Sequence, residues 1–151
     1  MTITENINLK ELYEIDDYLW IQETVKLLKE KQFNQLDLEN LIEELEDLGS
    51  EKRHAVESLL EQIIRHLLLL EYWASEYERN RNHWRAEIVS FRTQINKKIT
   101  TNFYNYLNQH LAEIYDDARL YVIEKSSLQT FPEQCPYTLD QLLDKHWFPL
   151  K

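Results

Sequence analysis

The chain has 151 residues, of which 43% are hydrophobic and 29% charged, a balance that excludes an intrinsically disordered protein. Its formal net charge of −10 argues against indiscriminate binding to nucleic acid or acidic membranes as the main activity. We expect a single domain over residues 1–151, because this length suits one core. The single Cys135, the lack of a signal-peptide pattern and the lack of a membrane-spanning apolar run predict a cytoplasmic location.

Helices are the elements expected along the chain, because one glycine and three late prolines leave little of the turn chemistry of β-hairpins. The first helix is expected from about residue 9 to residue 31, and the second in LDLENLIEELEDLG, residues 36–49. Gly49 is expected to end the second helix as a left-handed cap, and Ser50 to begin the third. The apolar positions of the first two helices are Leu12, Ile15, Leu19, Trp20, Leu27, Leu38, Leu41, Ile42, Leu45 and Leu48.

Three more main helices follow. The third and longest is expected over residues 50–77, with an apolar arc that includes Leu60, Ile63 and Leu67. A polar break at residues 78–83 precedes the fourth, and the fifth is expected over residues 103–125. The fourth carries Trp84, Ile88, Phe91, Ile95 and Ile99 on one face. Five helices joined by short connections predict an all-α fold, an antiparallel bundle.

The segment from residue 131 to residue 149 contains all three prolines. Pro132 and Pro136 prevent a helix and force an extended path, and the capping-box pattern Thr138-x-x-Gln141 predicts a short C-terminal helix. We expect this segment to lie as a strap across the open end of the bundle, although Pro-flanked aromatic residues also form partner-binding tails. The expected anchors of the strap are Phe131, Tyr137, Leu142, Trp147 and Phe148.

The polar residues are distributed unevenly along the chain. Residues 37–62 hold nine acids and two bases, whereas residues 79–98 hold six bases and one acid. On a helical wheel, Arg81, Arg85 and Arg92 lie together beside the apolar face. They either pair with Glu44 and Glu46 between helices, or form a stripe that binds an anion or a partner. His83 and Trp84 would add a polar and a stacking group to such a stripe.

His66 lies at the edge of the apolar arc of the third helix. A histidine in such a position is usually a core residue with a hydrogen-bonded ring. If it faces Glu44 or Glu46 across a cleft, it becomes a candidate general acid or base. No cofactor and no metal site are expected, because the only Glu-x-x-His motif, at Glu51 and His54, is turned away from the apolar face.

Several motifs in this order resemble one bacterial family, described as domain of unknown function 29 (DUF29). They are the segments LDLENLIEELEDLG, RHLLLLEYW, HWRAEIVSFRTQI and FPEQCPYTLDQLL, followed by a Trp-Phe-Pro ending. The resemblance implies a small all-α bundle of bacterial origin without an established biochemical role. The matching positions are Asp16, Trp20, Glu44, Glu46, Gly49, His66, Trp84, Arg85, Arg92 and residues 131–137.

Two functional hypotheses remain open from the sequence. The first is a non-enzymatic interaction or regulatory module that binds a protein partner or a second copy through Arg81, Arg85 and Arg92, or through the strap. Nucleic acid is a weaker candidate partner, and a membrane is not expected. The alternative is a small hydrolase or nuclease with His66, Glu44 and Glu46 as catalytic candidates and the arginines as anion ligands.

Overall fold

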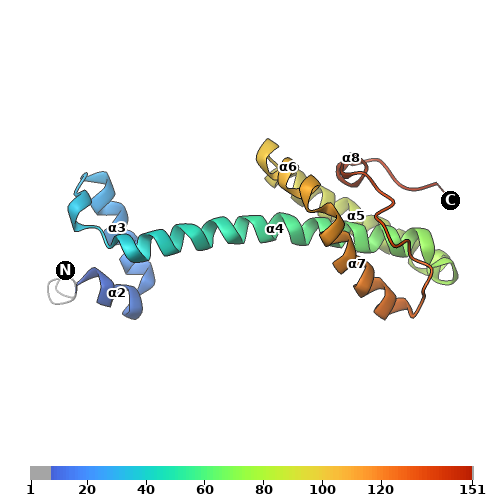
Figure 1. The fold of residues 1–151 in the computed structure, drawn as a ribbon, viewed down its shortest axis with the longest axis horizontal. Coiled ribbons are helices and arrows are strands. Elements are labelled where there is room, and N and C mark those ends of the chain that lie inside the picture. Colours follow the sequence, from blue (N-terminus) through green and yellow to red (C-terminus); the bar gives the residue numbers. More distant parts are fainter. Residues whose placement is uncertain (1–7, 151) are drawn as a thin grey trace. The chain divides into compact units, whose positions relative to one another are not determined.

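The computed structural model describes residues 8–150, which are mainly α-helical (Figure 1). Within these residues there are seven α-helices, two short 3₁₀ turns and no β-strand, so the predicted all-α fold is confirmed. None of these helices is both long and apolar enough to cross a bilayer. The helices are α2 Leu9–Ile15, α3 Asp17–Lys29, α4 Leu38–Tyr72, α5 Tyr77–Lys98, α6 Thr101–Gln109, α7 Leu111–Ser126 and α8 Leu139–Leu143.

The contacts within the chain form two compact units, a first unit that ends at Glu51 and a second unit that begins at Lys52. The first turns of α4 belong to the first unit and the remainder of α4 to the second. The expectation of one domain stays a prediction.

In the described part of the first unit, the two helices α2 and α3 occupy the segment for which the sequence pattern predicted one helix. The predicted single helix is wrong because Asp16 interrupts it: its carboxylate accepts a hydrogen bond from the amide of Leu19 at 3.0 Å and caps α3. Aspartate favours this position because its side chain satisfies an amide that has no partner within the helix. The chain therefore turns at Asp16, and α2 packs against α3.

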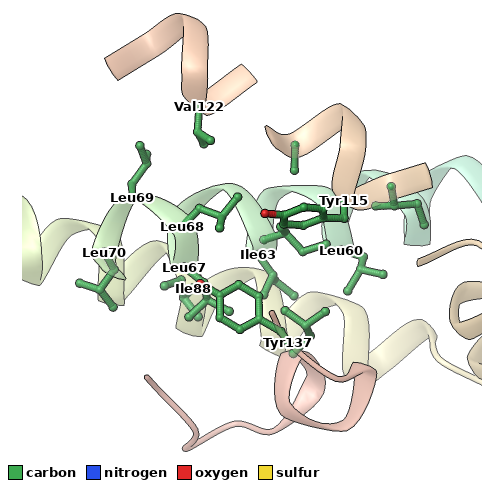
Figure 2. Close-up of a cluster of buried hydrophobic side chains, with 14 of the residues drawn as sticks. Leu60, Ile63, Leu67, Leu68, Leu69, Leu70, Ile88, Tyr115, Val122 and Tyr137 are labelled. Atoms are coloured by element: carbon green, nitrogen blue, oxygen red, sulfur yellow. The ribbon is translucent and has the colours of Figure 1, made fainter. Parts of the chain in front are cut away.

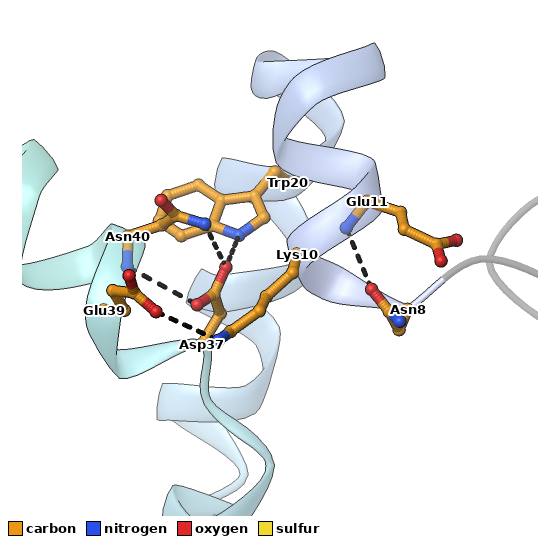
Figure 3. A network of polar contacts seen from close by, with 7 residues as sticks. All are labelled: Asn8, Lys10, Glu11, Trp20, Asp37, Glu39 and Asn40. Carbon is orange, nitrogen blue, oxygen red and sulfur yellow. Dashed lines mark hydrogen bonds and ion pairs between the residues drawn. The ribbon is translucent and has the colours of Figure 1, made fainter.

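Trp20 and Asp37 connect α3 to the start of α4. Trp20 is buried, and its indole nitrogen donates to the buried carboxylate of Asp37 at 3.3 Å (Figure 3). The same carboxylate accepts hydrogen bonds from the backbone and side-chain amides of Asn40. Asp37 thus satisfies an indole N–H and a free amide at the N-terminus of α4, and it positions this terminus against α3.

α4 continues through Gly49 to Tyr72, so the predicted helix end at Gly49 is wrong. Among residues 8–150, only Lys31 and Ser127 have a positive φ, and Gly49 therefore does not form a left-handed cap. Good helix formers on both sides outweigh the cost of one glycine in a helix, which is about 1 kcal/mol. A Cβ atom at Gly49 would meet no atom within 4 Å.

The core of the second unit is built around the rest of α4 (Figure 2). Leu60, Ile63 and Leu67 are fully buried there, so the predicted apolar arc is confirmed. Buried residues of α5 and α7, among them Ile88 and Tyr115, pack against this arc. Three boundaries differ from the prediction: α4 ends at Tyr72 and not at residue 77, residues 78–83 are helical within α5, and His110 separates α6 from α7.

The predicted C-terminal strap is confirmed. Thr138 and Gln141 form the expected reciprocal capping box at the start of α8. The chain from residue 131 to residue 148 packs on the core of the second unit, with Phe131, Tyr137 and Leu142 buried and Trp147 and Phe148 partly buried.

Candidate functional site

Arg92 is buried in the second unit and holds the strap. The exposed fraction of Arg92 is 1%, and its guanidinium donates to the carbonyls of Leu142 at 2.8 Å, Trp147 at 2.6 Å and Gln141 at 3.0 Å. Burial lowers the pKa of Arg92 to about 10. Gln141 and Leu142 lie in the last turn of α8, so Arg92 caps carbonyls that have no partner within that helix. Each of the three guanidinium nitrogens therefore donates one hydrogen bond to the strap.

The other two predicted arginines occupy different surroundings. The Arg85 guanidinium lies 3.7 Å from the centre of the Phe148 ring, which Arg92 also approaches at 5.1 Å. Arg81 is exposed, with its guanidinium 5.9 Å from the ring of Tyr77. Within residues 8–150 none of these arginines forms an ion pair. The strap therefore brings Arg85 and Arg92 together at one aromatic ring, whereas Arg81 remains on the surface.

His66, His83 and Trp84 line one pocket of about 280 Å³ in the second unit. The His66 ring donates from Nδ1 to the carbonyl of Gln62 at 2.7 Å and packs against Phe91. Burial lowers the pKa of His66, so its neutral form is favoured. The complete lining is His66, Leu69, Trp73, Asn80, His83, Trp84, Tyr121 and Lys125.

The two glutamates predicted to assist His66 lie in the first unit. Glu44 accepts a hydrogen bond from the hydroxyl of Tyr13 at 2.5 Å, and this bond raises the pKa of Tyr13 to about 12. Glu46 is exposed. Because His66 belongs to the other unit, its combination with these carboxylates stays a prediction. No group of three or more His, Cys, Asp or Glu side chains in residues 8–150 is placed to hold a metal ion.

The sequence did not identify an apolar groove between α3 and the first turns of α4. On α3, Ile21, Val25 and Leu28 form a stripe at i, i+4 and i+7, with exposed fractions of 45%, 42% and 41%. The groove between the helices has a volume of about 320 Å³. We call it the apolar groove, and it is lined by Trp20, Ile21, Thr24, Val25, Leu28, Leu41, Glu44, Leu45, Leu48 and Glu51.

The second wall of the apolar groove repeats the spacing of the first. Leu41, Leu45 and Leu48 also stand at i, i+4 and i+7, and the exposed fractions of Leu45 and Leu48 are 59% and 47%. The helical period of these leucines made them resemble core residues, but no described residue of the first unit covers Leu45 or Leu48, and Leu41 is only partly buried. The signal that could have identified the groove is the identical spacing on two neighbouring helices.

The apolar groove combines exposed aliphatic side chains with acidic ones. A folded monomer rarely leaves many large aliphatic side chains exposed side by side, because each keeps apolar area in water at about 25 cal/mol per Å². Two carboxylates, Glu44 and Glu51, line the same groove, and none of its described lining residues is basic. The groove therefore offers aliphatic contacts with acidic groups beside them.

Comparisons with known proteins identify a family without an assigned activity. Neither the curated proteins nor the solved structures give a match. Residues 12–148 match the family model described as domain of unknown function DUF29. This match covers α3 to α8 entirely, including both walls of the apolar groove and the strap. The chain therefore belongs to the DUF29 family.

Proposed function

We propose that the chain is a protein-interaction module that binds a helix of a partner protein in the apolar groove. The observation that carries this proposal is a pair of aliphatic stripes that line one groove. Ile21, Val25 and Leu28 on α3 are exposed, and so are Leu45 and Leu48 on α4, where the partly buried Leu41 completes the second stripe. The aliphatic side chains on both walls of the groove recur at i, i+4 and i+7. The apolar anchors of an amphipathic helix have the same spacing, so such a helix could contact both walls.

The free energy for binding would come from burying these side chains. Covering an exposed aliphatic side chain contributes about 1–2 kcal/mol, and the groove presents several of them on a helical scaffold. Because helices α3 and α4 are already held together by Trp20 and Asp37, little ordering is required when the partner binds.

The arginines are not included in this binding surface. Arg92 donates to strap carbonyls, and Arg85 lies on the ring of Phe148. Of these three arginines only Arg81 is exposed, and one exposed arginine contributes little affinity.

The test uses a displayed library of helices with leucine at three positions spaced i, i+4 and i+7 and with varied residues at the flanking positions. The library is panned against the folded chain, and the enriched helices are synthesised for affinity measurements. We expect Leu45→Gln to weaken their binding by about tenfold, because an anchor contact in the groove is lost.

Leu120→Gln is the matched control, because Leu120 is also helical and has an exposed fraction of 65%, against 59% for Leu45. We expect this variant to bind within about twofold of the wild type. Glutamine is a good helix former and both sites are exposed, so both variants should stay folded. Panning that enriches no helix, or enriched helices that bind Leu45→Gln as tightly as the wild type, would overturn the proposal.

A further inference from the structure

We infer that the helix bound in the apolar groove is cationic, with lysine or arginine flanking its apolar stripe. This inference rests on the proposed function and adds the chemistry of the partner. Its basis is the acidic character of the first unit and of the groove itself.

The first unit carries most of the net charge of the protein. Between residues 8 and 51 there are thirteen acidic and four basic residues, compared with a formal net charge of −10 for the whole chain. A cationic partner would be attracted to this unit and accelerated in its approach at low salt.

The charges that line the groove have one sign. Glu44 and Glu51 lie at the side of the Leu41, Leu45 and Leu48 stripe, and no lysine, arginine or histidine among residues 8–150 lines the groove. Glu44 is held in place because its carboxylate accepts a hydrogen bond from the hydroxyl of Tyr13 at 2.5 Å. A lysine or arginine beside the apolar stripe of a bound helix could pair with either carboxylate without losing its contact with water.

The same charges disfavour the other occupants of an apolar groove. A second copy would bring an equally acidic surface against the first. Anionic lipid would be repelled in the same way, because a surface that binds it needs a basic patch. An amphipathic helix with basic flanks satisfies both the apolar and the charged parts of the groove.

The test compares three synthetic helical peptides that share one leucine stripe and carry lysine, glutamine or glutamate at the flanking positions. Their affinity for the full chain is measured by fluorescence anisotropy at low and at high NaCl. We expect the lysine peptide to bind about fivefold to tenfold more tightly than the glutamate peptide at low salt, because it gains two exposed ion pairs. High salt should reduce this preference.

The variants locate the preference in the groove. We expect the double variant Glu44→Gln/Glu51→Gln to lose most of the preference for the lysine peptide. The control variant Glu124→Gln/Glu133→Gln removes the same charge from exposed positions of the second unit and should keep this preference. Glu51→Gln alone leaves the bond between Tyr13 and Glu44 intact, and should remove part of the preference without affecting the fold.

The failures of the two proposals are distinguishable. The glutamine or glutamate peptide could bind as tightly as the lysine peptide, or more tightly, and lose this binding in Leu45→Gln. That result would overturn the inference of a cationic partner but would leave the groove as a docking site. Binding of phosphatidylglycerol vesicles, or dimerisation of the chain, with the same sensitivity to Leu45→Gln would also overturn it. If neither the three peptides nor the displayed library binds, the proposed function fails as well.

Discussion

Arg92 shows how much of the second unit can depend on one side chain. Its three hydrogen bonds reach the carbonyls of Gln141, Leu142 and Trp147, about fifty residues later in the chain. We expect Arg92→Met to lower the free energy of unfolding by about 3 kcal/mol, since buried carbonyls would lose charged donors. Urea unfolding measures this loss.

Arg81→Met on the same helix is the control and should change the free energy of unfolding by less than about 0.5 kcal/mol. Equal losses of stability in the two variants would contradict the assigned role of Arg92.

His66 gives the second unit a pH dependence whose sign follows from its burial. Burial lowers the pKa of His66 below the ordinary value of 6.5, although Glu87 nearby acts in the opposite direction. Below this ordinary value the unfolded chain binds more protons than the folded chain, so the free energy of unfolding falls as the pH drops.

His66→Gln should remove this contribution. We expect the stability difference, wild type minus variant, to decrease between about pH 7.5 and about pH 5, as measured by urea unfolding at each pH. The other histidines are present in both proteins, so the difference reports His66 together with its electrostatic interaction with His83. A difference that increases on acidification would mean that the pKa of His66 is raised.

At the scale of elements, Gly49 lies within α4 and not at the end of a helix. We expect Gly49→Ala to increase the free energy of unfolding by about 0.5–1 kcal/mol, because alanine restricts the unfolded chain and meets no atom within 4 Å. Thermal denaturation measures the gain. A loss of stability would instead indicate the left-handed cap that the sequence pattern predicted.

The sequence predicts the helices and their apolar faces better than it predicts which residues pack on each apolar face. Leu60 and Ile63 were correctly expected in the core because the third helix is apolar around a wide arc. Leu45 and Leu48 have the same spacing but are exposed, since periodicity gives the direction of a side chain and not its neighbours.

The site was predictable only where its determinants are local. The capping box at Thr138 can be read from a few residues, and the structure confirms it. Arg92 was expected at a core boundary near an anion, and its actual partners are backbone carbonyls, which no side-chain pattern reveals. The apolar groove depends on how α3 packs beside α4, so neither helix alone could identify it.

At the scale of the whole molecule, the excess of acids makes stability depend on salt. A formal net charge of −10, most of it before residue 52, produces repulsion in the folded state. We expect the melting temperature to rise by a few degrees between about 0.02 M and about 0.3 M NaCl, as the Debye length falls from roughly 20 Å to roughly 6 Å. Calorimetry of the wild type and of Glu44→Gln/Glu51→Gln measures the melting temperature at each salt concentration, and its increase should be smaller in the variant. A melting temperature that falls as NaCl is added would mean that attractive ion pairs dominate over repulsion.

The order of synthesis gives the clamp between Arg92 and the strap a consequence for biogenesis. A nascent chain acquires Arg92 long before Gln141, Leu142 and Trp147 have been translated. Until these residues emerge from the ribosome, the second unit would have to bury a charged guanidinium without acceptors, which is costly. We therefore expect this unit to complete its folding only after Trp147 has left the ribosome, and chains truncated before residue 141 to be substrates for chaperones and proteases.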